Sequence, residues 1–160
     1  MIWHHQINLN APSFLQEWEK IYACKNLDKE AGGTLYYTIK DEKNCIDEFK
    51  AAILNHLQIA QEHICDGSLD YIVFAYPDFE ITIHTDNIYQ YFEHRRLIYV
   101  LQECDQGGEY FDETQKVLLR QNMLYEIEAD KPHGLTKIRG QKPLILAIMS
   151  YLKEKDTTDV

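Results

Sequence analysis

The chain has 160 residues, enough for a single domain built around one hydrophobic core. Its 16 basic and 26 acidic residues give a net charge of −10, which argues against nucleic acid as a partner because phosphate contacts need clustered Lys and Arg. The acidity also disfavours binding to an anionic membrane surface, and no apolar stretch approaches the roughly 20 residues that span a bilayer. With no signal-peptide pattern and four scattered cysteines, we expect a cytoplasmic protein with reduced thiols.

The first third, about residues 1–67, reads as mainly helical. Phe14, Trp18 and Tyr22 recur every four residues after Pro12, so they would share one helix face. A short strand is expected over residues 35–39. A second helix is predicted by an apolar stripe that ends just before Gly67, a glycine suited to a C-terminal cap; the stripe consists of Ile46, Phe49, Ile53, Leu57, Ala60 and Ile64.

From residue 69 to about residue 152 the pattern changes to short runs rich in β-branched and aromatic residues, separated by turn signals. Strands are expected at 71–76, 80–84, 96–101, 116–119, 123–127, 134–138 and 144–149. Runs of this length and spacing are typical of a β-sandwich or barrel, here with helices packed on one side. We therefore predict one mainly β domain over 1–160, with N-terminal helices as a buttress.

A metal site is suggested by the segment 81–86, Ile-Thr-Ile-His-Thr-Asp. Residues two apart in a strand point to the same face, so His84 and Asp86 would project together while Ile81 and Ile83 face the other way. Such a pair alone occurs by chance in many proteins. His133, at the start of a later expected strand, would complete a set of two His and one carboxylate, the arrangement of non-haem iron(II) oxygenases.

Several further motifs follow in a fixed order. They are Tyr76-Pro-Asp before the metal strand, Arg95-Arg96-Leu-Ile-Tyr99-Val-Leu-Gln after it, Gly107-Gly108-Glu109-Tyr-Phe111, His133, and Gly140-Gln-Lys142. In this order the motifs resemble the Fe(II)/2-oxoglutarate dioxygenase superfamily, in its prolyl-hydroxylase-like branch. The resemblance implies a double-stranded β-helix, a jelly-roll or cupin-like barrel. It also implies hydroxylation, or a related C–H oxidation, of a small molecule or a peptide side chain.

The same resemblance implies the ligands and their contacts. Fe(II) would be held by His84, Asp86 and His133, with 2-oxoglutarate as co-substrate and ascorbate as a candidate third cofactor. Lys142, or in its place Arg139, would pair with the distal carboxylate of 2-oxoglutarate. Tyr76 and Tyr99 would donate hydrogen bonds to it, although the family's tyrosine in that strand aligns with either Tyr99 or Val100, which face opposite sides.

Other interpretations remain open from the residues alone. Arg95 or Arg96 would reach a substrate carboxylate, or would pair with Glu109 or another surface acid. Gly107 and Gly108 are expected to serve a tight turn and close backbone approach. A cupin-type metal enzyme on the same barrel class would favour His-x-His, which the sequence lacks. A non-enzymatic β-barrel binding module would not need Asp86 and His133 to converge.

Overall fold

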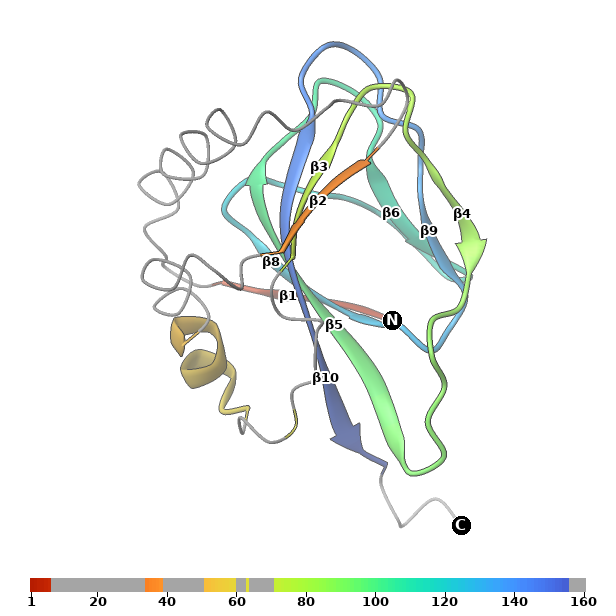
Figure 1. Ribbon diagram of the computed structural model, residues 1–160. Coiled ribbons are helices and arrows are strands. Elements are labelled where there is room, and N and C mark those ends of the chain that lie inside the picture. Colours follow the sequence, from red (N-terminus) through yellow and green to blue (C-terminus); the bar gives the residue numbers. More distant parts are fainter. Residues whose placement is uncertain (7–33, 39–50, 60–62, 64–70, 156–160) are drawn as a thin grey trace.

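The fold consists of two antiparallel β-sheets that face each other (Figure 1). The structure, a computed structural model, describes residues 1–6, 34–38, 51–59, 63 and 71–155. The large sheet has the strand order β1-β8-β5-β10-β3-β2 and the small sheet the order β4-β9-β6-β7. The strands are β1 (Ile2–His5), β2 (Thr34–Thr38), β3 (Tyr71–Ala75), β4 (Ile81–His84), β5 (Phe92–Gln102), β6 (Glu109–Asp112), β7 (Lys116–Leu118), β8 (Leu124–Glu128), β9 (His133–Leu135) and β10 (Leu144–Glu154).

From β3 onward the chain passes back and forth between the sheets. β3, β5, β8 and β10 belong to the large sheet, and β4, the β6–β7 hairpin and β9 belong to the small one. This alternation produces the double-stranded β-helix that the sequence predicted. Each of the seven strands expected after residue 69 is present, and β6 is an additional strand formed by the Gly-Gly-Glu-Tyr-Phe segment.

The hydrophobic core lies between the two sheets. The large sheet contributes inward-facing residues such as Ile98, Val100 and Leu146, and the small sheet contributes Tyr110 and Leu135. In β5 the residues between these inward positions, Leu97, Tyr99 and Leu101, are also buried. A strand buried on both faces reads as a continuous apolar run, which is the pattern of residues 97–101.

One described helix covers residues 51–57, and Figure 1 shows it on the side of the large sheet away from the small sheet. It ends earlier than the apolar stripe predicted. Gln58 has a left-handed φ of 56°, its amide donates to the Asn55 carbonyl at 3.3 Å, and the Ile59 amide donates to the Leu54 carbonyl at 2.9 Å. These bonds form a Schellman cap, so the helix stops at residue 57 without the expected glycine.

The expectation of a mainly helical segment over 1–67 is also wrong at its start. Residues 2–5 form β1, an edge strand that pairs with β8 through Ile2–Ile127 and His5–Leu124. The strand predicted at 35–39 is confirmed as β2, which pairs with β3. The helix expected around Phe14, Trp18 and Tyr22 lies outside the described residues. Within the described part of the chain, no helix is both long enough and apolar enough to cross a membrane.

Gly107 and Gly108 have the turn function predicted for them. Their φ values are 72° and 64°, a region that other residues enter with strain. A Cβ on Gly107 would overlap with the carbonyl oxygen of Lys137, and one on Gly108 would lie 2.8 Å from the Cys104 sulfur. Both glycines therefore allow the β5–β6 connection to approach the segment after β9.

Candidate metal centre

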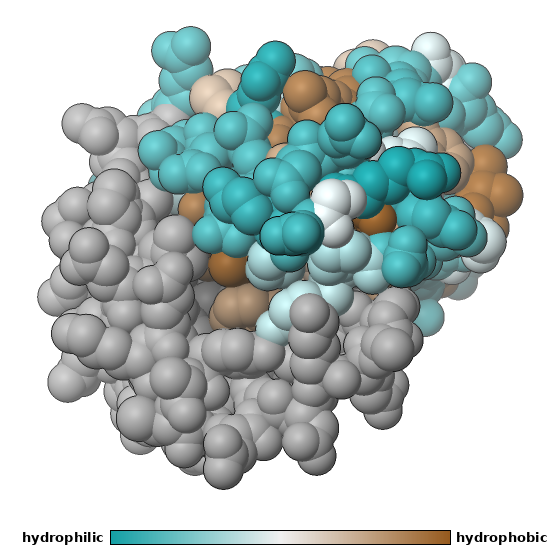
Figure 2. Space-filling view, turned by 90° about the horizontal axis from the view of Figure 1, so that it is seen from above, coloured by the Kyte–Doolittle hydropathy of each residue, from teal (hydrophilic) through white to brown (hydrophobic). Residues whose placement is uncertain are grey.

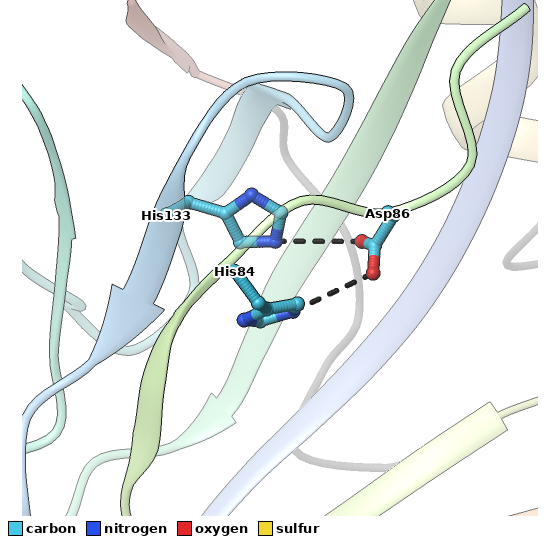
Figure 3. Close-up of side chains that lie close together, drawn as sticks. All are labelled: His84, Asp86 and His133. Atoms are coloured by element: carbon cyan, nitrogen blue, oxygen red, sulfur yellow. Dashed lines mark ion pairs between the residues drawn. The ribbon is translucent and has the colours of Figure 1, made fainter.

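His84 and His133 are brought together by strand pairing. β4 ends at His84, β9 begins at His133, and the two residues are direct partners across the antiparallel pair. Their ring centroids lie 4.5 Å apart. Residues 49 positions apart in the sequence thus present their imidazoles at the same end of the small sheet, as Figure 3 shows.

Asp86 lies next to the two histidines, as predicted, but strand alternation is not what places it there. The register of β4 shifts between Ile81 and His84, and the strand ends at His84, so strict alternation does not extend to residue 86. Consequently Ile81 lines the same cavity as His84 and Asp86, while Ile83 is 57% exposed. Asp86 is held instead by its own backbone, whose amide donates to the Ala129 carbonyl at 2.9 Å.

The three side chains form a compact donor set. His84 Nε2 lies 3.4 Å from Asp86 Oδ1, and His133 Nε2 lies 3.4 Å from Asp86 Oδ2 (Figure 3). One ligand atom from each residue falls within 4.8 Å of the others. Among the described residues this is the one cluster of three or more His, Cys, Asp or Glu side chains that could hold a metal ion.

The hydrogen bonds of both imidazoles leave Nε2 available to a metal. His84 Nδ1 lies 2.8 Å from the Thr82 carbonyl oxygen, and His133 Nδ1 lies 2.7 Å from the Lys131 carbonyl oxygen. Because a carbonyl oxygen only accepts, each Nδ1 must donate, and in the neutral ring Nε2 then carries the lone pair. This second hydrogen bond is the usual way in which proteins orient metal-binding histidines.

One buried ligand atom of the cluster, His133 Nε2, lacks a hydrogen-bond partner among the described residues. It faces Asp86 Oδ2 at 3.4 Å, and that carboxylate oxygen also forms an ion pair with Arg96. An unsatisfied buried lone pair costs free energy unless something binds it. The donor set of two imidazole Nε2 atoms and one carboxylate therefore fits a divalent cation.

Asp86 is ionised at physiological pH. Burial alone would raise its pKa, but the contact with His133 and the positive charge of Arg96 outweigh burial and lower the pKa to about 2. Arg96 Nη1 lies 2.6 Å from Asp86 Oδ2. The carboxylate is thus in the charged form that a metal ligand requires.

The cluster lies beside a cavity of about 530 Å³ between the two sheets. His84, Asp86, Arg96 and Ser150 provide its polar lining; the rest is apolar and consists of Val73, Ala75, Phe79, Ile81, Leu135, Leu146 and Ile148. This volume is within the range of small-molecule sites. The arrangement can therefore hold a metal ion and, next to it, a ligand with one charged end.

The two cations that the resemblance assigned to the co-substrate lie elsewhere. Lys142 is exposed and its amide donates to Asp105 Oδ2 at 3.0 Å; Arg139 is exposed and its backbone pairs with Gln106. Both belong to the connection between β9 and β10, at the opposite end of the barrel from the point where β4 ends (Figure 1). Figure 2 looks onto that end and shows a mostly hydrophilic surface.

The tyrosines predicted to contact the co-substrate are buried but are not among the residues that line the cavity. Tyr76 directly follows β3, whose Val73 and Ala75 do line it. Tyr99 lies between Ile98 and Val100, which face the core between the sheets, so the alternation of β5 directs Tyr99 to the opposite face.

Two residues beside the metal ligands were not distinguished from their neighbours by the sequence alone. Arg95 and Arg96 were treated as equivalent, but Arg95 pairs with Glu93 and Glu126 on the other face of β5, whereas Arg96 lines the cavity. The second is Tyr110, whose ring stacks on His133 at a centroid distance of 5.6 Å. The sequence offered one indication for Tyr110, its place in the Gly-Gly-Glu-Tyr-Phe motif. In a strand, Tyr110 points to the face opposite to Glu109 and Phe111.

Comparison with known proteins supports the fold. No family model matches the sequence, and no curated protein matches it. Among solved structures, HygX from Streptomyces hygroscopicus, with nickel and 2-oxoglutarate bound, is similar with a TM-score of 0.69 at 11% identity, over 96% of this chain and 82% of that one.

Two prolyl hydroxylases are similar to a comparable degree. The Pseudomonas putida prolyl-4-hydroxylase has a TM-score of 0.66 at 15% identity, over 97% of this chain and 93% of that one. The prolyl hydroxylase from Trichoplax adhaerens, in complex with a hypoxia inducible factor peptide fragment, has a TM-score of 0.65 at 14% identity, over 94% and 82%. The chain therefore has the same double-stranded β-helix fold as these three proteins.

Proposed function

We propose that this protein is a non-haem iron(II) oxygenase that couples oxidative decarboxylation of 2-oxoglutarate to hydroxylation of a small molecule or a peptide side chain. One observation carries the proposal. Two imidazole Nε2 atoms with free lone pairs and one ionised carboxylate converge at the edge of a cavity, on a fold whose solved neighbours include proteins with nickel, iron and 2-oxoglutarate bound.

His84, Asp86 and His133 would hold the metal and leave its other positions open to ligands. When bound, iron(II) and 2-oxoglutarate supply the oxidising chemistry: the co-substrate loses CO2 and becomes succinate, and one atom of dioxygen is inserted into a C–H bond of the substrate. The solved neighbours accommodate both substrate classes, because HygX is known with hygromycin B bound and the Trichoplax enzyme with a peptide.

The protein's own contribution is to orient and shield the ligands. The carbonyl oxygens of Thr82 and Lys131 fix the two imidazole rings, and the Ala129 carbonyl fixes the loop that carries Asp86. The seven apolar residues of the cavity would exclude bulk water from the ligand beside the metal.

The test is a turnover assay without added substrate. Purified protein with iron(II), 2-oxoglutarate and dioxygen should form succinate slowly, and Asp86→Ala should form none above the protein-free background. Glu113→Ala, which removes an exposed carboxylate outside the cluster, is the matched control and should retain the wild-type rate. Equal succinate formation by the wild type and Asp86→Ala would rule out the proposed function.

A further inference from the structure

We propose that Arg96 is the residue that binds a carboxylate of the co-substrate. This inference rests on the proposed function and assigns to Arg96, on β5, the role that the sequence motif assigns to Lys142. It starts from the composition of the cavity, because Arg96 carries the one permanent positive charge among the described residues that line it.

The guanidinium group of Arg96 is held in place by two contacts, which leave some of its N–H donors without an acceptor. Nη1 contacts Asp86 Oδ2 at 2.6 Å, and Nε donates to Ser150 Oγ at 3.3 Å. Ser150 is itself buried and is the register partner of Arg96 across β5 and β10. A guanidinium has five N–H donors in a planar fork, so donors remain for a further acceptor in the cavity. The side chain is 26% exposed, and its exposed part faces the space beside the metal ligands.

The balance of charge also favours this role. A divalent metal, the Asp86 carboxylate and a 2-oxoglutarate dianion sum to one negative charge in a largely apolar cavity. Uncompensated charge in such surroundings is strongly unfavourable. Arg96 brings the sum to zero, and a guanidinium matches a carboxylate through paired hydrogen bonds.

Lys142 is too distant to provide this charge. Arg96 lies opposite Ser150 in the sheet, and Lys142 precedes Ser150 by eight residues. At about 3.3 Å per residue of strand, the six steps from Ser150 to Leu144, where β10 begins, span roughly 20 Å. Lys142 lies beyond that end of the strand, too far for its side chain to reach Arg96's position. The inward-facing residues between them on β10, Leu144, Leu146 and Ile148, are apolar.

Ligand binding to the nickel(II)-loaded protein, measured by titration calorimetry, tests the assignment independently of turnover. Two ligands are compared, 2-oxoglutarate and 2-oxopentanoate, which has the same chain length but lacks the distal carboxylate. Because Arg96 touches Asp86, the nickel affinity of each variant is measured first and all titrations are made at saturating metal. Arg96→Gln should bind 2-oxoglutarate about 10- to 100-fold more weakly than the wild type, the loss expected for a hydrogen-bonded charge pair.

Two variants with the same change of charge serve as comparisons. Arg120→Gln, at an exposed position outside the cavity, should bind both ligands as the wild type does. Lys142→Gln tests the rival assignment directly. If Arg96→Gln weakens 2-oxoglutarate alone, the guanidinium binds the distal carboxylate; if it weakens both ligands equally, it binds the carboxylate next to the metal. Both results support the proposal.

Wild-type affinity in Arg96→Gln, or a tenfold loss in Lys142→Gln alone, would overturn the proposal while leaving the proposed function intact. Absence of 2-oxoglutarate binding to the wild-type nickel protein is a distinct result, because it would remove both the inference and the function on which it rests.

Discussion

His84 and His133 are register partners across β4 and β9, and each donates from Nδ1 to the carbonyl oxygen two residues before it in the chain. The same local geometry is therefore used on both strands to aim Nε2 at Asp86. The metal centre depends on the pairing register of two short strands and on one loop hydrogen bond, from the Asp86 amide to Ala129.

Replacing His133 should remove metal binding without unfolding the protein. We expect His133→Ala to lower iron(II) affinity by more than about 100-fold, because loss of a direct ligand exceeds the 10- to 100-fold effect of losing an outer hydrogen bond. Equilibrium dialysis of the metal, with far-UV circular dichroism to check the fold, measures this. His56→Ala, at an exposed helix position, is the control and should bind metal normally. Tight binding by His133→Ala would remove this residue from the site.

The Asp112 carboxylate should make the stability depend on pH in acid. Burial raises its pKa, but hydrogen bonds that Oδ1 accepts from the amide and hydroxyl of Thr114 and from the Gln115 amide outweigh burial, and the pKa falls from 3.8 to about 2. A carboxyl whose pKa is lowered in the folded state stabilises it above pH 3.8, and that contribution disappears as the pH falls toward 2.

Denaturant unfolding between pH 5 and pH 2 measures this contribution. The wild type should be more stable than Asp112→Asn at pH 5, and the difference should shrink steadily as the pH falls. Glu113→Gln, an exposed neighbour, is the control for removal of one acidic group. A difference that stays constant over this range would show that the charge of Asp112 does not stabilise the β6–β7 turn.

Gly107→Ala should be more destabilising than Asn122→Ala. Both positions have a positive φ, 72° and 64°, so an alanine at either position destabilises the folded state by about 1–2 kcal/mol of backbone strain. At position 107 the new Cβ also overlaps with the Lys137 carbonyl oxygen, which is backbone and cannot turn aside. Thermal unfolding of the two variants compares the costs, and equal losses would mean that the β5–β6 connection relaxes around the added methyl group.

Loss of the Tyr110 hydroxyl should not destabilise the protein. The hydroxyl is buried and has no hydrogen-bond partner among the described residues, and burial raises the pKa of the phenol, so it stays protonated. Tyr110→Phe keeps the ring that stacks on His133. We expect an unfolding free energy within about 0.5 kcal/mol of the wild type or higher, measured in urea. A loss of more than 1 kcal/mol would indicate that the hydroxyl has a structural partner.

The sequence predicted the barrel well because its strands are short, β-branched and separated by turn residues that only loops tolerate. It predicted that His84, Asp86 and His133 lie together because they occur in a recognisable order, and the structure brings the three side chains together. It failed where local sequence does not determine the outcome. Residues 2–5 form a strand only because β8 offers an edge, and Gln58 ends a helix whose apolar stripe continues beyond it.

The arginine pair shows the same limit at the site. Arg95 and Arg96 are adjacent and chemically identical, so only the register of β5 separates a residue bound to Glu126 on one face from a residue in the metal cavity on the other. Lys142 has the positive charge that the motif requires, but it lies in the β9–β10 connection, where its backbone amide donates to Asp105. The order of the motifs was enough to pick out the candidate ligands His84, Asp86 and His133, but only the three-dimensional register of β5 shows that Arg96 faces them.

If His84, Asp86 and His133 hold iron(II) as proposed, the bound metal should also bind 2-oxoglutarate. The anaerobic visible spectrum of the protein with iron(II) and saturating 2-oxoglutarate tests this. A weak metal-to-ligand charge-transfer band should be present in the wild type and in His56→Ala but absent in His84→Ala. A wild-type protein that binds iron(II) without this band at saturating 2-oxoglutarate would contradict the proposal.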